Sequence, residues 1–379
     1  MALVLNEEQV LIKDTAHNFF AAEAPVASLR ALRDEGDALG YSPALWRDMA
    51  ELGFAGILVA EEYGGSGLGY LAMGLVLEES GRTLAATPLL ATAVIGAAAL
   101  QLGGSAAQQS ELLPAVAAGE LLLALAHEEG AHHDPRHVAT RAGPVDGGFR
   151  ISGEKRFVLD GHVADRLIVA ARTAGGPADD EGVSLFLLPA DAAGIKRTRT
   201  MMVDSRNAAR ISFDGVTVGP EAVLGEIGGA AGLLDDLLDR ARIALSAEML
   251  GSISEAFERS IEYLKVRQQF GVPIGSFQAL KHRAALMFNE IELSKSIVME
   301  GLDALDAGRG DVAELASCAK AKLCDAFELV SSEAVQLHGG IGMTDEEEIG
   351  FFLKRARVAQ QSFGDAAFHR DRFARLREF

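Results

Sequence analysis

Cysteine is scarce in this chain: Cys318 and Cys324 are the two examples among 379 residues. They lie six positions apart in a helical pattern, and this spacing matches neither a redox motif nor a zinc site. We therefore expect both to be reduced residues of a packed core.

Long apolar runs and a basic leader are also missing. The longest apolar stretch, LLATAVIGAAAL (89–100), is well short of the ~20 residues that cross a bilayer. The first residues, MALVLNEEQV, lack the basic and apolar regions of a signal peptide. These absences predict no membrane insertion and a cytoplasmic location.

Positive charge is in short supply, with 35 Lys and Arg against 54 Asp and Glu and a net charge of −19. This balance argues against nucleic acid or an anionic membrane as the main partner, and an anionic ligand would need a local basic cluster. Hydrophobic residues make up 49% of the chain and charged residues 23%, which is typical of a soluble globular protein of two or three domains.

The periodicity divides the chain into three segments. Residues 1–120 alternate helical patterns with short breaks, with Asn6 and Pro43 suited to helix starts. Residues 121–222 contain short β-rich runs without helices between them, which predicts an antiparallel sheet domain. Residues 223–379 are helical, with runs near 233–270, 277–307, 311–338 and 346–361 that predict a four-helix bundle. The predicted fold class is α+β.

Two motifs in the first two segments favour ordinary structure over binding sites. The run GGSGLG (64–69) resembles a phosphate-binding turn, but it lacks the parallel βαβ unit that such a turn needs, so we expect a helix connection. The run HEEGAHHDPRH (127–137) is rich in histidine. Pro135 prevents His133 and His137 from sharing a helix face, so we expect a polar loop and no metal.

Two motifs in the third segment favour a dinucleotide ligand. YLKVRQQFGVPIGSFQALKH (263–282) combines an exposed arginine, an aromatic residue and an amide around a glycine turn, and QLHGGIGM (336–343) adds a glycine pair at a helix end. A flavin dinucleotide needs a guanidinium for its pyrophosphate and close backbone approach. Each motif alone could be only a helix cap or a turn; their occurrence together favours the ligand.

With these motifs the sequence resembles the acyl-CoA dehydrogenase family over essentially its whole length. The runs LNEEQ, LWRDMAELGFAGILVAEEYGGSGLG and ISGEKRFVLDGHVADRLIVAART are also similar to that family. The resemblance implies the predicted fold, FAD, acyl-CoA thioester substrates, an electron-transfer flavoprotein as acceptor, and oligomers with FAD at a subunit interface. It further implies that the ADP half of FAD is held by Arg267, Gln269, Phe270, Gln278, Gln336, Gly339 and Gly340.

The resemblance also identifies where substrate and base should lie. Asp239 and Arg242 match the family's thioester-CoA contacts. The family's catalytic Glu occupies one of two positions, which here hold Phe363 and Ala241. Asp365 lies two residues past the first position, where a helix cap is the favoured interpretation over a displaced base.

The sheet segment departs from the family as well. Where members usually read T-E-P-x-A-G-S-D beside the flavin, this chain reads HEEGAHHD (127–134). The family's W-I-T, whose Thr bonds flavin N5, corresponds to Phe157-Val158-Leu159. Some family members that act on steroid side chains or dicarboxyl-CoA esters pair an active subunit with a degenerate one.

Two hypotheses therefore stand. In the first, the chain is an FAD-dependent acyl-CoA dehydrogenase that performs α,β-dehydrogenation, in fatty acid or steroid side-chain catabolism, with Asp365 or another acid as its base. In the second, it is the non-catalytic subunit of a heteromeric dehydrogenase and supplies the ADP-binding half of the FAD site. A homo-oligomer fits the first hypothesis, and a heteromer with a second related chain fits the second.

Overall fold

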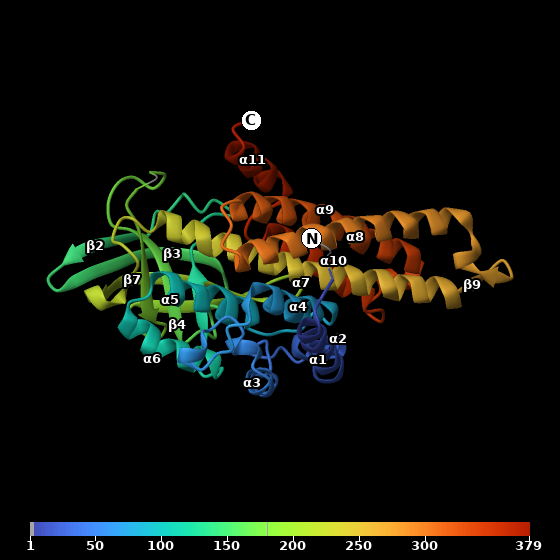
Figure 1. Ribbon diagram of the computed structural model, residues 1–379, viewed down its shortest axis with the longest axis horizontal. Helices are drawn as coiled ribbons and strands as arrows, with labels where there is room; N and C mark the ends of the chain where they lie inside the picture. The colour runs from blue at the N-terminus through green and yellow to red at the C-terminus, as the bar shows by residue number, and fades with distance from the viewer. Residues whose placement is uncertain (1–3, 180) are drawn as a thin grey trace. The chain divides into compact units, whose positions relative to one another are not determined.

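The computed structural model describes residues 4–179 and 181–379 (Figure 1). The chain forms two compact units, and each draws on distant parts of the sequence. We call the first the bundle unit; it contains Met1–Ala31, Tyr70–Ala85 and Arg242–Phe379. The second, the sheet unit, contains Leu32–Gly69 and Ala86–Ala241.

The bundle unit is built from long helices, as the periodicity of the third segment predicts. The four long runs of that segment correspond to α7 (Ala231–Val266), α8 (Gln278–Asp306), α9 (Val312–His338) and α10 (Ile349–Gln361), followed by α11 (Ala366–Leu376). From the N-terminal segment the unit takes α1 (Glu7–Glu23) and α4 (Gly69–Arg82), and α2 (Val26–Asp34) begins in it. The predicted cap at Asn6 is present, because its side chain accepts from the Gln9 backbone N–H at 2.8 Å.

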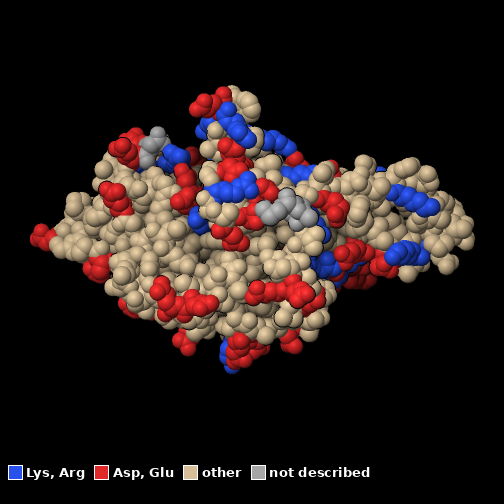
Figure 2. Space-filling view, viewed as in Figure 1, with Lys and Arg blue, Asp and Glu red and all other residues tan. Residues whose placement is uncertain are grey.

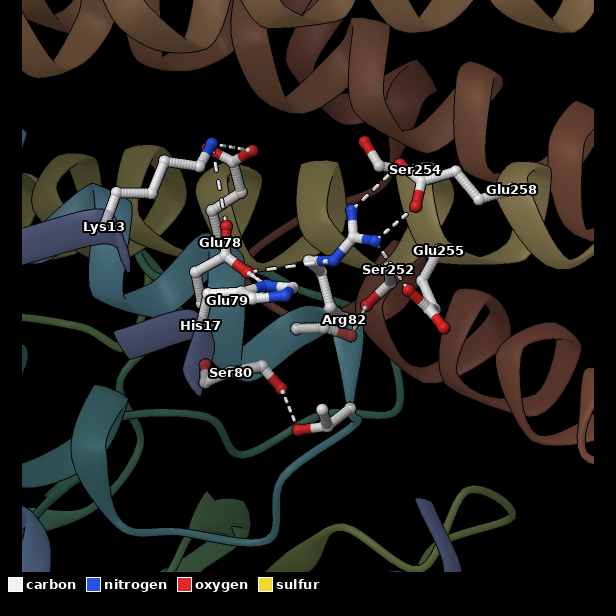
Figure 3. A network of polar contacts seen from close by, with 12 residues as sticks. Lys13, His17, Glu78, Glu79, Ser80, Arg82, Ser252, Ser254, Glu255 and Glu258 are labelled. Atoms are coloured by element: carbon white, nitrogen blue, oxygen red, sulfur yellow. Dashed lines mark hydrogen bonds and ion pairs between the residues drawn. The ribbon is translucent and has the colours of Figure 1, made fainter. Parts of the chain in front are cut away.

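Helices α1 and α4 join α7 through a network of charged side chains (Figure 3). Lys13 lies 2.7 Å from Glu78, and His17 lies 2.9 Å from the buried Glu79. On the other side, Arg82 lies 2.8 Å from Glu255 of α7. Lys13, Glu78 and Arg82 border a cavity of about 250 Å³, and the mutual pairing of the charged side chains marks the network as a structural one.

Glycines let α4 and α7 approach more closely than most helix pairs. A Cβ on Gly81 would lie 2.0 Å from the Glu248 carbonyl oxygen, and one on Gly251 would lie 1.7 Å from that of Glu78. The Ser252 hydroxyl donates to the Gly81 carbonyl at 2.8 Å. Larger side chains at either glycine would force these helices apart.

The sheet unit contains an eight-stranded sheet in the order β6-β7-β3-β2-β4-β5-β8, with β1 paired to β4. Antiparallel pairs dominate, including a β2–β3 hairpin that turns at the predicted Asp146-Gly147-Gly148 segment. The strands of the sheet are β1 (Leu123–Ala126), β2 (Arg141–Val145), β3 (Gly148–Leu159), β4 (Arg166–Arg172), β5 (Val183–Pro189), β6 (Ile195–Met201), β7 (Asn207–Val218) and β8 (Val223–Leu224).

One part of the sheet corrects the prediction of antiparallel pairing throughout. β1 runs parallel to β4, with Leu123 opposite Arg166, and a single residue pair joins β2 to β4 in parallel. The chain between β1 and β4 is long enough for a crossover because the whole β2–β3 hairpin lies within it. β4 and β5 are buried along nearly their whole length, so both faces of the sheet centre are covered.

The rest of the sheet unit consists of short helices and turns. The GGSGLG run connects η2 to α4 without a βαβ unit around it, so the prediction of a helix connection is confirmed. The remaining helices are α3 (Pro43–Glu51), η1 (Phe54–Gly56), η2 (Glu61–Tyr63), η3 (Leu89–Gly96), α5 (Ala97–Gly103), α6 (Ala106–Ala117) and η4 (Pro220–Ala222).

Two surface properties bear on the expectations from composition. Cys324 is buried as predicted, but Cys318 is exposed, so the prediction that both cysteines lie in a core is wrong. In the described part of the chain, no helix combines the length and apolarity that a bilayer crossing requires. Figure 2 shows acidic side chains spread over the visible face, with basic ones between them.

Candidate functional site

A hairpin between α7 and α8 presents the first dinucleotide motif. β9 (Gln268–Gln269) pairs with β10 (Val272–Pro273), which leaves Phe270 and Gly271 as a two-residue turn, before η5 (Ile274–Ser276). Both turn residues have positive φ, 55° and 79°, as a type I′ turn requires. Phenylalanine seldom adopts this conformation, and the Phe270 side chain is 90% exposed. The chain thus holds an aromatic ring outward at a cost in backbone energy.

Polar groups around this hairpin are also exposed. Among the described residues, none forms a hydrogen bond or ion pair with the Arg267 guanidinium, whereas the neighbouring Lys265 lies 2.5 Å from Glu262. Gln278 is the exposed first residue of α8, where backbone N–H groups lack helical partners. Gln269 is exposed as well, and its amide bonds only locally, to the Gln268 carbonyl at 2.9 Å.

The second motif lies at the end of α9 and meets the first through stacked rings. Tyr263 of α7 stacks on His338 of α9 with 4.4 Å between ring centroids, so the two helix ends lie together. Beyond His338, η6 (Gly339–Met343) begins with two exposed glycines. A Cβ added at Gly339 or Gly340 would meet none of the described atoms within 4 Å. Gln336 is exposed one turn earlier, so all seven residues of the predicted ADP site are open to solvent.

The loop at the usual base position has the opposite character. Phe363 is buried and has φ 57°, and its carbonyl oxygen accepts from the Arg242 Nε–H at 3.2 Å. The buried Lys320 ammonium donates to the Gly364 carbonyl at 2.8 Å and to the Gln360 carbonyl at 3.2 Å. Burial lowers the pKa of Lys320. Two cationic side chains therefore fix the backbone of this loop.

Asp365 lies where the sequence favours a helix cap. Its carboxylate accepts from the Phe368 backbone N–H at 2.8 Å, and its backbone is extended, as in an N-cap of α11. The other candidate position, Ala241, is fully buried on α7. Of the buried acids on the bundle helices, Glu248 lies 3.1 Å from Arg355, and Glu79 belongs to the network of Figure 3.

Asp239 and Arg242 share a face of α7 one turn apart. Asp239 is 4% exposed and Arg242 is 0% exposed. The two side chains therefore do not lie on a solvated helix face. Arg242 also lies over the Phe368 ring, with 5.6 Å from its guanidinium carbon to the ring centroid. The arginine thus joins α7 to the loop at the usual base position.

In the sheet unit, the loop after β1 collects charged and imidazole groups. The Glu128 carboxylate lies 3.1 Å from Nε2 of His127 and in close contact with Nδ1 of His133. Although burial alone would raise the pKa of Glu128, the two imidazoles hold it well below its usual range. Sequence reasoning missed this cluster because it considered the pair His133 and His137. The run His127-Glu128-Glu129 directly after a strand, with His133 a few residues later, was the available signal.

Beside this cluster, β3 ends with the residues that replace the family's W-I-T. Phe157 is 46% exposed and has φ 49°, while Leu159 is the last residue of the strand. The fully buried Lys155 ammonium lies 2.7 Å from Glu129, and burial lowers the pKa of this lysine. This edge of β3 presents apolar groups, and its charged groups are paired with each other.

Comparisons with known proteins agree with this architecture. The N-terminal, middle and C-terminal domains of acyl-CoA dehydrogenases match residues 6–120, 124–216 and 231–376. Acyl-CoA dehydrogenase IpdE2 of Mycolicibacterium smegmatis is 30% identical, over 95% of this chain and 96% of its own. A solved Tcur3481-Tcur3483 steroid ACAD variant is 33% identical, with a TM-score of 0.88 over 98% of each chain.

A cofactor-bound structure is similar as well. The solved FAD complex of PigA is 25% identical to this chain, with a TM-score of 0.91 over 100% of this chain and 99% of that one. Matches to three domain families cover most of the chain. The seven residues of the predicted ADP site, which we call the clamp residues, are exposed, so a dinucleotide can reach them. The chain belongs to the acyl-CoA dehydrogenase family of FAD-dependent oxidoreductases.

Proposed function

We propose that this chain is one subunit of a heteromeric acyl-CoA dehydrogenase, in which it holds the ADP half of FAD and a second, related chain supplies the general base. The reaction is the α,β-dehydrogenation of an acyl-CoA thioester. One observation carries the proposal: the clamp residues are exposed, whereas both usual base positions hold apolar side chains, Phe363 and Ala241.

The clamp residues fit FAD in their chemistry. The Arg267 guanidinium offers a planar pair of donors that suits a pyrophosphate, and Phe270 offers an exposed ring for packing. Gly339 and Gly340 let backbone approach a phosphate or sugar. Gln269, Gln278 and Gln336 offer amides for polar edges of the ligand. Bound FAD supplies the hydride acceptor of the reaction.

The chain's own contribution to substrate handling lies on α7. Asp239 and Arg242 would contact the thioester-CoA portion of the substrate, since both are buried on one helix face. Arg242 also orients the loop at the usual base position through the Phe363 carbonyl. The α-proton must then pass to a carboxylate of the second chain while hydride leaves the β-carbon, so that two electrons leave the substrate.

The alternative function makes the chain self-sufficient, with Asp365 as its base. A base must be free to take a proton, whereas the Asp365 carboxylate already accepts the Phe368 N–H at the start of α11. The cap geometry therefore favours the heteromer.

Exposed apolar side chains on α8 supply a surface for a second chain. Leu286, Phe288 and Leu293 are 61%, 50% and 59% exposed. Apolar side chains that cluster on one exposed helix mark association surfaces. The similar steroid ACAD is named after two proteins, Tcur3481 and Tcur3483, which supports the pairing of this chain with a related one. The same name makes a steroid-linked acyl group a candidate substrate. An electron-transfer flavoprotein is the proposed acceptor.

The test compares the purified chain with the same chain co-expressed with a related chain that carries the missing Glu. Both samples are assayed with a CoA-ester panel and a dye acceptor at saturating FAD. We expect turnover by the mixture to exceed that of the chain alone by about 10²–10⁴, the usual contribution of a general base. Brisk turnover by the isolated chain that is abolished in Asp365→Asn would establish the alternative.

A further inference from the structure

The loop after β1 brings three metal-ligating groups together, although they come from residues up to six positions apart. One donor atom from each of His127, Glu128 and His133 lies within 4.8 Å of the others. In a tetrahedral zinc site, bonds of about 2.0–2.2 Å separate the ligand atoms by roughly 3.3–3.6 Å. The three donors are thus close to coordinating distance before any metal is added.

The backbone around the cluster is held by hydrogen bonds that do not use the three donors. Lys155 Nζ donates to the His127 carbonyl at 3.1 Å, and the Arg156 backbone N–H donates to the Glu128 carbonyl at 2.8 Å. Both donors belong to β3, so a strand of the sheet fixes the first half of the cluster. Ligands on rigid elements are positioned more accurately than ligands on free loops.

The second half of the cluster is placed by a tether across the loop. Glu129 accepts from the backbone N–H groups of Ala139 at 2.7 Å and Thr140 at 2.9 Å. These bonds draw residues 130–138 into a closed turn, and His133 lies within that turn over Glu128. Glu129 also pairs with Lys155, so the tether and the strand form one connected support.

Burial separates this cluster from ordinary surface histidines. The side chains of His127, Glu128 and His133 are 6%, 12% and 4% exposed. His132 and His137, which flank them in the same loop, are exposed. A sheltered set of two imidazoles and one carboxylate is a donor set that zinc and similar divalent ions accept.

We propose that His127, Glu128 and His133 bind one divalent transition-metal ion of the zinc type. Three protein donors leave a fourth position for water, and the bound ion closes the loop 127–138. This proposal revises the sequence-based expectation of a metal-free polar loop. It does not depend on the heteromer proposed above, because its test measures metal and not turnover.

The local charge balance accommodates such an ion. Glu129 neutralises Lys155, so the carboxylate of Glu128 remains to offset part of a divalent charge. The chain as a whole carries a net charge of −19, which favours cations over anions near the protein. A simple hydrogen-bonded trio is the competing interpretation, in which Glu128 accepts from both imidazoles and no metal binds.

The experiment uses the full chain, stripped with a chelator and dialysed against Zn²⁺ or Co²⁺, with metal content and the cobalt visible spectrum as readouts. We expect one ion per chain and the intense cobalt absorption of a four-coordinate site. His127→Gln and His133→Gln should weaken binding at least about tenfold, since even supporting groups of metal ligands contribute that much. His132→Gln and His137→Gln are the matched controls and should bind like the parent chain.

Two results would overturn the proposal. One is a parent chain that takes up less than stoichiometric metal, or that binds cobalt with the weak spectrum of a six-coordinate surface site. The other is an equal loss of affinity in the cluster variants and the control variants. Far-ultraviolet circular dichroism establishes that each variant is folded, and the parent spectrum decides the question if a cluster variant does not fold.

Discussion

Polar groups at two places along α7 differ in burial: those near Arg242 are buried and bonded, and those near Arg267 are exposed. Near Arg242, Phe363 and Gly364 are buried, and their carbonyls are bonded to Arg242 and Lys320. Near Arg267, roughly 35–40 Å further along the helix, the guanidinium and the Phe270 ring are exposed. The polar groups of the first region are bonded within this chain, whereas those of the second are exposed and open to a ligand.

The comparison supports the proposed function, in which this chain keeps the residues that hold the ADP half of FAD and a second chain supplies the base. With Phe363 in place of the usual Glu, the loop remains stable because the Arg242 and Lys320 side chains already bond its backbone. The exposed Phe270 ring contacts Phe277 edge-on and has positive φ, so packing gives it little stabilisation, and FAD binding is the role proposed for it.

Removing the clamp arginine should produce the largest effect. Arg267→Ala deletes a charge-assisted donor pair to the pyrophosphate, so we expect FAD affinity to fall about 10–100-fold. Flavin absorbance after dialysis of the assembled protein measures the loss. Lys265→Ala removes a neighbouring cation that is paired with Glu262, and it should leave FAD content nearly unchanged. Equal flavin retention in both variants would contradict the assigned role of Arg267.

Replacing the buried lysine should destabilise the opposite region. Lys320→Met leaves the Gly364 and Gln360 carbonyls without this donor, and we expect the free energy of unfolding to fall by about 1–3 kcal/mol. Lys322→Met removes a partly exposed lysine of the same helix that pairs with Glu290, and it should change the free energy of unfolding by less than about 1 kcal/mol. Urea denaturation of both variants measures these changes in the free energy of unfolding.

The pH dependence of the same pair gives a sharper test. Burial lowers the folded-state pKa of Lys320 below its ordinary value, so between these two pKa values the unfolded chain binds more protons. Stability should therefore rise with pH across that window in the parent chain, relative to Lys320→Met. If the two stability curves run parallel from neutral to alkaline pH, the buried lysine is not the titrating group.

Asp365 should behave as a cap and not as a base. Asp365→Ala should lower the free energy of unfolding by about 1 kcal/mol, whereas Asp365→Asn, which can still accept the Phe368 N–H, should cost only a few tenths. Turnover of the assembled heteromer should change less than about twofold in Asp365→Asn, far from the loss that a missing base causes. A large loss of turnover without loss of stability would reverse the assignment.

The smallest expected effect has a sign opposite to the others. Phe270→Gly relieves a left-handed phenylalanine, so we expect a gain of up to about 0.5–1 kcal/mol in the stability of the flavin-free chain. The same variant should bind FAD more weakly because the exposed ring is gone. Thermal unfolding with and without FAD measures both changes, and a variant that is less stable without FAD would refute the strain argument.

The sequence was sufficient for the features that depend on periodicity and spacing. The helices α8 and α9 lie within about two residues of their predicted bounds because their apolar positions repeat over many turns. Strand β6 was missed because IKRTRTM is too charged to read as a buried strand, and its partner β7 supplies the pairing. The parallel β1–β4 pair was missed because strand pairing between distant residues leaves no local pattern.

The candidate sites also differ in how much of each could be predicted from the sequence. The seven residues of the proposed ADP clamp could be named from the sequence because they fall in two short motifs at helix ends. The cluster of His127, Glu128 and His133 could not be predicted from the sequence. The contacts that hold its loop, made by Glu129 and Lys155, join residues that are far apart along the chain. Likewise, the support of the 360–365 loop comes from Lys320, which is 44 residues away from the carbonyl it bonds.

The close glycine packing of α4 against α7 has a consequence for synthesis of the chain. The hydroxyl that bonds Gly81 comes from a residue 171 positions later in the sequence. At the usual rate of roughly 5–20 residues per second, α4 leaves the ribosome about 10–30 s before its partner does. During that interval the residues that α4 buries, which include Leu75, Val76 and Leu77, lack α7 as a packing partner. The nascent chain should therefore depend on chaperones that shelter apolar segments, and a ribosome stalled before residue 250 should leave an aggregation-prone fragment.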